Sequence, residues 1–143
     1  MQGSVAVAKP SLREIFKNDF ASSAFRIIDG EQRIIGKFID VEIVDGQFDL
    51  WLVRPDREPG SSCREAIGAR KLNNLIRAIE SLSAYDRDNR PHITKLDGEC
   101  YLRTTSTELV RESAFVGGVK RKKRYSEAAL QASIERLRQI NAA

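Results

Sequence analysis

The chain has 143 residues, of which 41% are hydrophobic and 31% charged, and its formal net charge is +4. This length suits one domain with its own core, and the composition is too apolar for a disordered chain. No apolar run approaches the roughly 18 residues of a membrane span, and no signal-peptide pattern opens the chain. We therefore expect a cytoplasmic protein.

The charge is distributed unevenly along the chain. Residues 1–62 carry a balance of −2, residues 63–110 a balance of +1, and residues 111–143 a balance of +5. Such an asymmetry is typical of proteins whose basic segment meets an anionic partner.

The beginning of the chain predicts an arm and then a helix. We interpret residues 1–9 as a flexible N-terminal arm and residues 10–143 as a single α+β domain with a basic C-terminal segment. Ser11 with Glu14 three residues later forms a capping-box pattern, which predicts that a helix begins there.

Three strands are predicted next, over Phe25–Ile28, Arg33–Val44 and Gln47–Arg54, with Gly36 as a bend or bulge in the second. Asp45-Gly46 is a strong signal for a two-residue hairpin turn. A turn at that point makes the facing positions on one side of the hairpin apolar: Ile43 opposite Phe48, and Val41 opposite Leu50. A shift by one residue would destroy this match, so the register is well specified.

The remaining elements are mostly helical. An unbroken apolar stripe predicts a helix over Arg64–Leu82, followed by a polar loop over Asp86–Pro91. A small hairpin is predicted over His92–Leu96 and Glu99–Arg103. A short helix then ends at Gly117-Gly118, and a last helix runs from Ser126 to about Ile140.

The predicted fold is α+β: a three-stranded antiparallel meander packed by helices, with a small hairpin and two C-terminal helices attached. We expect the Arg64–Leu82 helix to cover one face of the meander. The second face is expected to lie under the C-terminal helices, because their apolar stripes need a surface to pack on.

The strongest candidate site is a run of five consecutive cations: Lys120, Arg121, Lys122, Lys123 and Arg124. Lysine and arginine side chains bind nucleic acids by neutralising phosphates and releasing counterions, and Tyr125 beside the run can stack on a base. Gly117-Gly118 would let the segment adapt to a partner. The same residues suit a solvated loop or a docking site for an acidic protein surface.

A second basic surface is predicted on the long helix. Arg70 and Arg77 lie at i and i+7, with Lys71 adjacent, which places them on one side of the helix. This side can follow a phosphate backbone; it also suits the ordinary solvent-exposed face of an amphipathic helix.

The outer face of the hairpin gathers acids and aromatic residues. The register places Glu42 opposite Asp49 and Asp40 opposite Trp51, and it places Phe38 on the same face. Like charges directly opposite each other are unfavourable in a sheet, so the cluster suits a hard-cation site, a protein-binding surface, or exposed solubilising carboxylates that another element partly covers.

No pattern in the sequence predicts an enzyme. Neither a glycine-rich phosphate loop nor a G-x-S-x-G elbow is present, and no cofactor or metal is predicted from Cys63, Cys100 and the single histidine, His92. We predict a small non-enzymatic nucleic-acid-binding accessory or regulatory protein that contacts phosphates of DNA or RNA through the basic run. The alternative is a protein-interaction module, an inhibitor or adaptor, that uses the basic run or the Phe38, Asp40, Glu42, Asp49 and Trp51 face.

Overall fold

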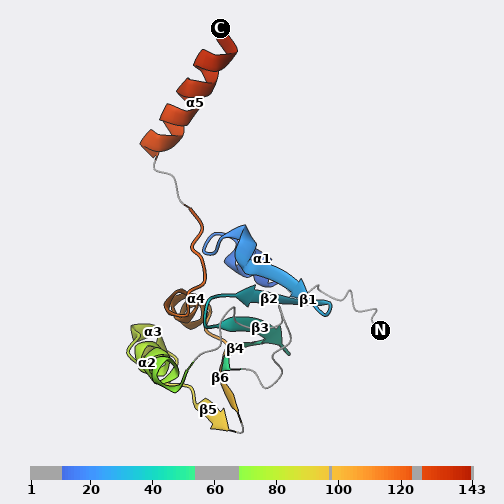
Figure 1. Ribbon diagram of the computed structural model, residues 1–143, viewed down its shortest axis with the longest axis vertical. Helices are drawn as coiled ribbons and strands as arrows, with labels where there is room; N and C mark the ends of the chain where they lie inside the picture. The colour runs from blue at the N-terminus through green and yellow to red at the C-terminus, as the bar shows by residue number, and fades with distance from the viewer. Residues whose placement is uncertain (1–10, 54–67, 97, 124–126, 143) are drawn as a thin grey trace, which may run out of the picture.

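One antiparallel sheet forms the centre of the computed structural model, which describes residues 11–53, 68–96, 98–123 and 127–142 (Figure 1). Within these residues the sheet has six strands in the order β1-β2-β3-β4-β6-β5. Their bounds are β1 Phe25–Ile28, β2 Glu31–Ile35, β3 Asp40–Val44, β4 Gln47–Val53, β5 Ile93–Leu96 and β6 Glu99–Thr104.

The prediction of a three-stranded meander is wrong, although the α+β class is right. The single strand expected over Arg33–Val44 is two strands, because the chain reverses direction at Gly36–Ile39, where the Gly36 amide donates to the Ile39 carbonyl at 2.8 Å. The small hairpin is not an attachment either. Its second strand, β6, pairs with β4 and so extends the same sheet.

The predicted register of the β3–β4 hairpin is confirmed. Ile43 faces Phe48, Val41 faces Leu50 and the turn lies at Asp45-Gly46. Both turn residues have positive φ, 51° and 78°, which is the conformation of a type I′ turn.

Helices occupy α1 Leu12–Phe16, α2 Ala69–Glu80, α3 Ser83–Arg87, α4 Thr107–Val116 and α5 Glu127–Ala142, with a 3-10 turn at Ser22–Ala24. The predicted cap is confirmed, since the Ser11 hydroxyl accepts from the Glu14 amide. The loop predicted from Asp86 begins later because α3 continues to Arg87. Residues 64–67 of the predicted long helix, the N-terminal arm and Cys63 lie outside the described residues.

The core lies on one face of the sheet. A row of paired and fully buried side chains crosses the central strands: Ile34, Val41, Leu50 and Leu102. Helices α1, α2 and α4 complete the core with Leu12, Phe16, Leu72, Leu75, Ile79, Leu109 and Val110.

The C-terminal helices do not cover the opposite face of the sheet, contrary to the prediction. Helix α4 packs beside α2 with Leu109 and Val110 in the core, and α5 stands away from the sheet (Figure 1). The opposite face carries the charged side chains of Arg33, Asp40 and Asp49 together with the apolar Ile35, and all four are buried. Among the described helices, none has both the length and the apolar character needed to cross a lipid bilayer.

Candidate functional site

Backbone hydrogen bonds fix the basic run against the body of the protein. The Lys120 carbonyl accepts from the Ala21 amide at 2.9 Å, and the Lys122 amide donates to the Asp19 carbonyl at 3.1 Å. Phe20 and Arg121 form an antiparallel bridge between these bonds. The part of the run that the structure describes, Lys120 to Lys123, is therefore an extended segment beside α1; Arg124 and Tyr125 lie outside the described residues.

The two glycines before the basic run fix it against the turn at residues 37–39 and do not make it flexible. The Gly117 carbonyl accepts from the Phe38 amide at 2.9 Å, and the Gly118 carbonyl accepts from the Lys37 amide at 3.3 Å. A Cβ on Gly117 would lie 2.5 Å from the Ile39 side chain, closer than two carbon atoms can approach. The expectation that these glycines let the segment adapt is wrong, because their backbone is packed against residues 37–39.

The anchored segment and α1 form the walls of a hollow of about 550 Å³, which we call the basic groove. It is lined by Arg13, Glu14, Lys17, Phe20, Ala21, Ser22, Phe25, Lys122 and Lys123. Phe20 and Phe25 pack together with ring centroids 6.3 Å apart, and the Arg13 guanidinium lies 5.1 Å from the centre of the Phe25 ring. The groove therefore combines an apolar aromatic wall with four cations from two distant parts of the chain and one carboxylate, Glu14.

The lysines of this surface form no ion pair with the described residues. None of the carboxylates in the described part of the chain lies within ion-pair distance of Lys17, Lys120, Lys122 or Lys123. The nearby acid Asp19 instead pairs with Arg111 at 3.9 Å. Exposed cations without protein partners are available to neutralise an external anion.

Arg121 has a different environment from its neighbours in the run. Its guanidinium carbon lies 3.7 Å from the centre of the Phe115 ring on α4, a cation–π contact that fixes the side chain against the body. Arg121 thus contributes to holding the segment in place, whereas Lys122 and Lys123 line the basic groove.

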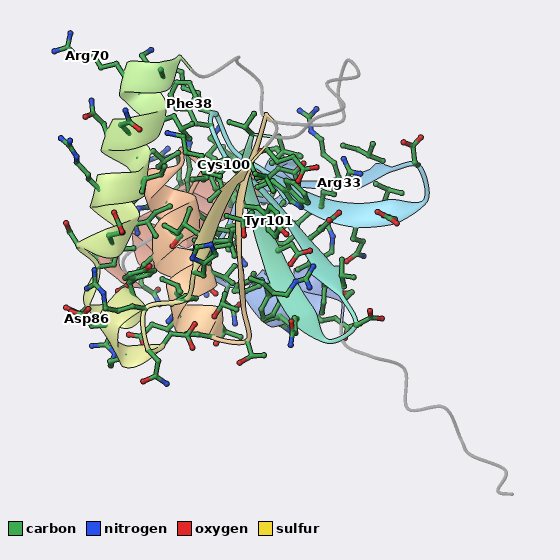
Figure 2. All side chains as sticks on the ribbon, turned by 90° about the horizontal axis from the view of Figure 1, so that it is seen from below. Arg33, Phe38, Arg70, Asp86, Cys100 and Tyr101 are labelled. Carbon is green, nitrogen blue, oxygen red and sulfur yellow. The ribbon has the colours of Figure 1, made fainter. Side chains whose placement is uncertain are left out.

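The three cations predicted on the long helix are all exposed on α2, and Lys71 is the one that contacts Phe38. The ammonium groups of Lys71 and Lys37 lie 5.2 Å and 5.3 Å from the centre of the Phe38 ring, and the Lys37 amide bonds to Gly118 just before the basic run. Lys71 therefore contacts the turn at 36–39, and this turn bonds to the two glycines that precede the basic run. Arg70 points away from the body at the beginning of α2 (Figure 2), and Arg77 is exposed further along the helix.

Phe38 does not belong to the acidic face of the sheet. The predicted pairing does not extend to it, because residues 36–39 form a turn instead of continuing β3. Its ring lies on the α2 side (Figure 2), and the ammonium groups of Lys37 and Lys71 both lie near it. The five residues predicted as one protein-binding face are thus divided between two surfaces.

Arginines neutralise the carboxylates of the opposite face. Arg33 on β2 lies 3.7 Å from the buried Asp40 and 3.9 Å from Glu42, and Arg103 on β6 donates to both oxygens of Asp49, at 2.7 Å and 3.2 Å. This hydrogen bond raises the pKa of Arg103. Within the described residues no group of three or more acids, histidines or cysteines is arranged to hold a metal ion.

Trp51 is part of the same polar network. Its indole Nε1 donates to Glu42 at 3.0 Å, and its ring lies 4.5 Å from that of Tyr101 on β6. The predicted positions of Asp40 opposite Trp51 and Glu42 opposite Asp49 are confirmed. The acids are therefore structural partners of arginine and tryptophan.

Sequence reasoning missed two residues of the basic groove, Arg13 and Lys17. They lie four positions apart at α1, and this spacing places them on the same side of a helix. That spacing was visible in the sequence, but the position of α1 beside the basic run was not. Comparison with protein-family models, curated proteins and solved structures found no significant match to this chain.

Proposed function

We propose that this protein binds nucleic acid through the phosphate backbone, with the basic groove and the adjoining Lys120 as the main contact surface. The observation that carries the proposal is the fixed position of the basic run. Backbone hydrogen bonds that join Lys120 to Ala21 and Lys122 to Asp19, in the loop after α1, hold it beside Arg13 and Lys17.

A fixed basic segment favours binding for a physical reason. A flexible segment must lose conformational freedom when a ligand orders it, whereas an anchored one has already been ordered by folding. The four cations that line the groove are thus held together before any phosphate arrives. Contacts to phosphates do not read bases, so this surface suits sequence-independent binding to DNA or RNA by a non-enzymatic accessory or regulatory protein.

Other cations extend the proposed surface. Lys71 and Lys37 flank Phe38 next to the beginning of the basic run, and a polyanion that passes over the run would reach them. Arg70 and Arg77 stay in the proposal as outlying contacts for a long duplex. A cytoplasmic protein would meet such polyanions, and this location is part of the proposal.

Two matched double variants test the proposal. Lys122→Ala/Lys123→Ala removes two cations of the basic groove, and Arg136→Ala/Arg138→Ala removes two cations from α5, so the net charge falls equally in both. Binding of labelled double- and single-stranded DNA and RNA is measured across a salt series by fluorescence anisotropy.

We expect the groove variant to reduce the salt slope by about 1.8 on a duplex, since each phosphate contact contributes about 0.9. The α5 variant should keep the wild-type slope. An equal decrease of the salt slope in both variants would mean that binding depends only on net charge and not on the groove. Absence of nucleic-acid binding by the wild type at low salt would reject the proposal. If the wild type binds no nucleic acid but still binds an acidic protein, the surface would be assigned to a protein partner.

A further inference from the structure

Helix α5 carries an apolar stripe with a coiled-coil spacing. Leu130, Ile134 and Leu137 follow one another at intervals of four and three residues, and Asn141 follows four residues later. These intervals are those of successive d and a positions in a heptad. The helix therefore has leucine at both d positions, and glutamate, isoleucine and asparagine at the successive a positions 127, 134 and 141.

Within the described part of the molecule, no other element packs against the apolar stripe of α5. Leu137 is 60% exposed and Ile140, beside the stripe, is 64% exposed, and α5 stands apart from the sheet and the other helices (Figure 1). A helix of this length is only marginally stable in water without tertiary packing. A partner that covers the stripe would supply the missing stabilisation.

We propose that the partner is a second copy of this chain, and that two α5 helices pair in parallel as a short coiled coil. Isoleucine at a with leucine at d favours two strands over three or four. In a parallel pair Asn141 meets Asn141 of the other copy, so the amides can bond to each other. In an antiparallel pair with the same seam each amide would face Leu130, which cannot hydrogen-bond to it.

The polar side of α5 argues against a membrane surface as the partner. It carries Glu135 alongside Arg136 and Arg138, whereas helices that lie on anionic lipid are rich in lysine and arginine on that side. On the opposite face of the sheet, Ile35, Asp40 and Asp49 are already buried, so these positions offer the stripe no open surface. The apolar stripe of α5 can instead pack against the same stripe of a second copy of the chain.

This inference stands independently of nucleic-acid binding. A parallel pair would nevertheless bring two basic runs to the same end of the coiled coil, because Lys123 precedes α5 by only four residues. The seam spans about two heptads, so we expect a weak dimer that dissociates on dilution.

Sedimentation velocity over a concentration series tests the pairing. The wild type should approach twice the 16.1 kDa mass of one chain at high concentration. Leu137→Asp should remain monomeric, because it places a charge in the seam. Gln139→Asp, which adds the same charge on the outer side of α5, should dimerise like the wild type. A monomeric wild type at the highest attainable concentration would overturn the proposal, as would a dimer that Leu137→Asp leaves intact.

Cysteine cross-linking tests the parallel orientation. In a Cys63→Ser background, Asn141→Cys should form a disulfide between copies on mild oxidation, because the two positions face each other in a parallel pair. Gln139→Cys on the outer side of the helix is the control and should not. Failure of Asn141→Cys to cross-link, or equal cross-linking of both variants, would overturn the parallel arrangement.

Discussion

Arg33 compensates the acids on the polar face of the sheet. Its guanidinium forms ion pairs with two acids of the neighbouring strand β3, Glu42 and the fully buried Asp40. Two like charges on adjacent positions of one face repel each other, and a buried carboxylate without a partner is costly. The arginine therefore offsets part of the repulsion between these two acids.

Replacing Arg33 should therefore destabilise the fold. We expect Arg33→Met to lower the free energy of unfolding by about 3 kcal/mol, since it removes a cation next to a buried carboxylate. Arg26→Met is the control, because Arg26 is exposed and directly opposite Arg33 on β1; its effect should stay within about 0.5 kcal/mol. Urea unfolding of the two variants measures both free energies. An equal decrease of the free energy of unfolding in the two variants would contradict the role given to Arg33.

Cys100 is a buried thiol on β6, and its burial raises the pKa of the thiol above the ordinary value. The unfolded chain therefore releases the thiol proton at a lower pH than the folded chain. The thiol's contribution to stability is complete below the ordinary thiol pKa and is lost as the pH rises through the alkaline range.

This burial predicts slow reaction with thiol reagents. In a Cys63→Ser variant, native protein at pH 8 should react with a disulfide reagent only as fast as the chain unfolds, whereas protein in denaturant should react at once. Rapid reaction of the native protein would show that Cys100 is accessible and would contradict its assigned burial.

At the scale of elements, the close approach of Gly117 to Ile39 determines where the basic run lies. Gly117 ends α4, and its carbonyl bonds to the turn between β2 and β3. The chain then passes Val119, which is buried, and pairs with Phe20. The position of the run beside α1 therefore depends on a helix end and a turn that are packed together without an intervening side chain.

Adding a side chain at this contact should destabilise the protein. Gly117→Ala places a Cβ 2.5 Å from Ile39, and we expect a loss of about 2 kcal/mol, typical of overpacking in a core. Gly68→Ala is the control, because a Cβ there meets nothing within 4 Å; its cost at the helix N-cap should stay below about 1 kcal/mol. Thermal unfolding of both variants tests the difference, and a smaller effect at Gly117 than at Gly68 would refute the steric account.

Local sequence patterns predicted some of these elements and not others. The β3–β4 register and the Ser11 cap depend on neighbouring residues, and both were correct. Gly36 predicts a bend within one strand, whereas the chain reverses there and the Gly36 amide bonds to the Ile39 carbonyl; the position also requires glycine, because a Cβ would meet Val119 at 2.8 Å. The larger sheet follows from this reversal and from the pairing of β6 with β4, which joins segments far apart in the chain.

The candidate site was predictable in part for the same reason. The cations of the basic run are evident in the sequence, but their fixed position beside Arg13 and Lys17 depends on pairing between segments that lie far apart in the chain. The acids of the sheet face were placed correctly, whereas the arginines that neutralise them come from β2 and β6, and β2 was not separated from β3 in the prediction.

At the scale of the whole molecule, charge and apolar surface are placed in different regions. The apolar core lies on one face of the sheet, the opposite face is neutralised by arginines, and the lysines of the basic groove gather where α1 meets the segment between α4 and α5 (Figure 1). The central claim is that α1 and this segment act together as one phosphate-binding surface.

The most direct test of that claim is the salt dependence of duplex binding by Lys17→Ala, a single change on the α1 side of the groove, compared with Arg138→Ala on α5. If the two segments form one surface, Lys17→Ala should reduce the slope of log K against log salt by about 0.9, the value expected for one lost phosphate contact. Arg138→Ala should leave the slope unchanged. An unchanged slope for Lys17→Ala, with binding by the wild type intact, would contradict the account, because nucleic acid would then bind without entering the groove.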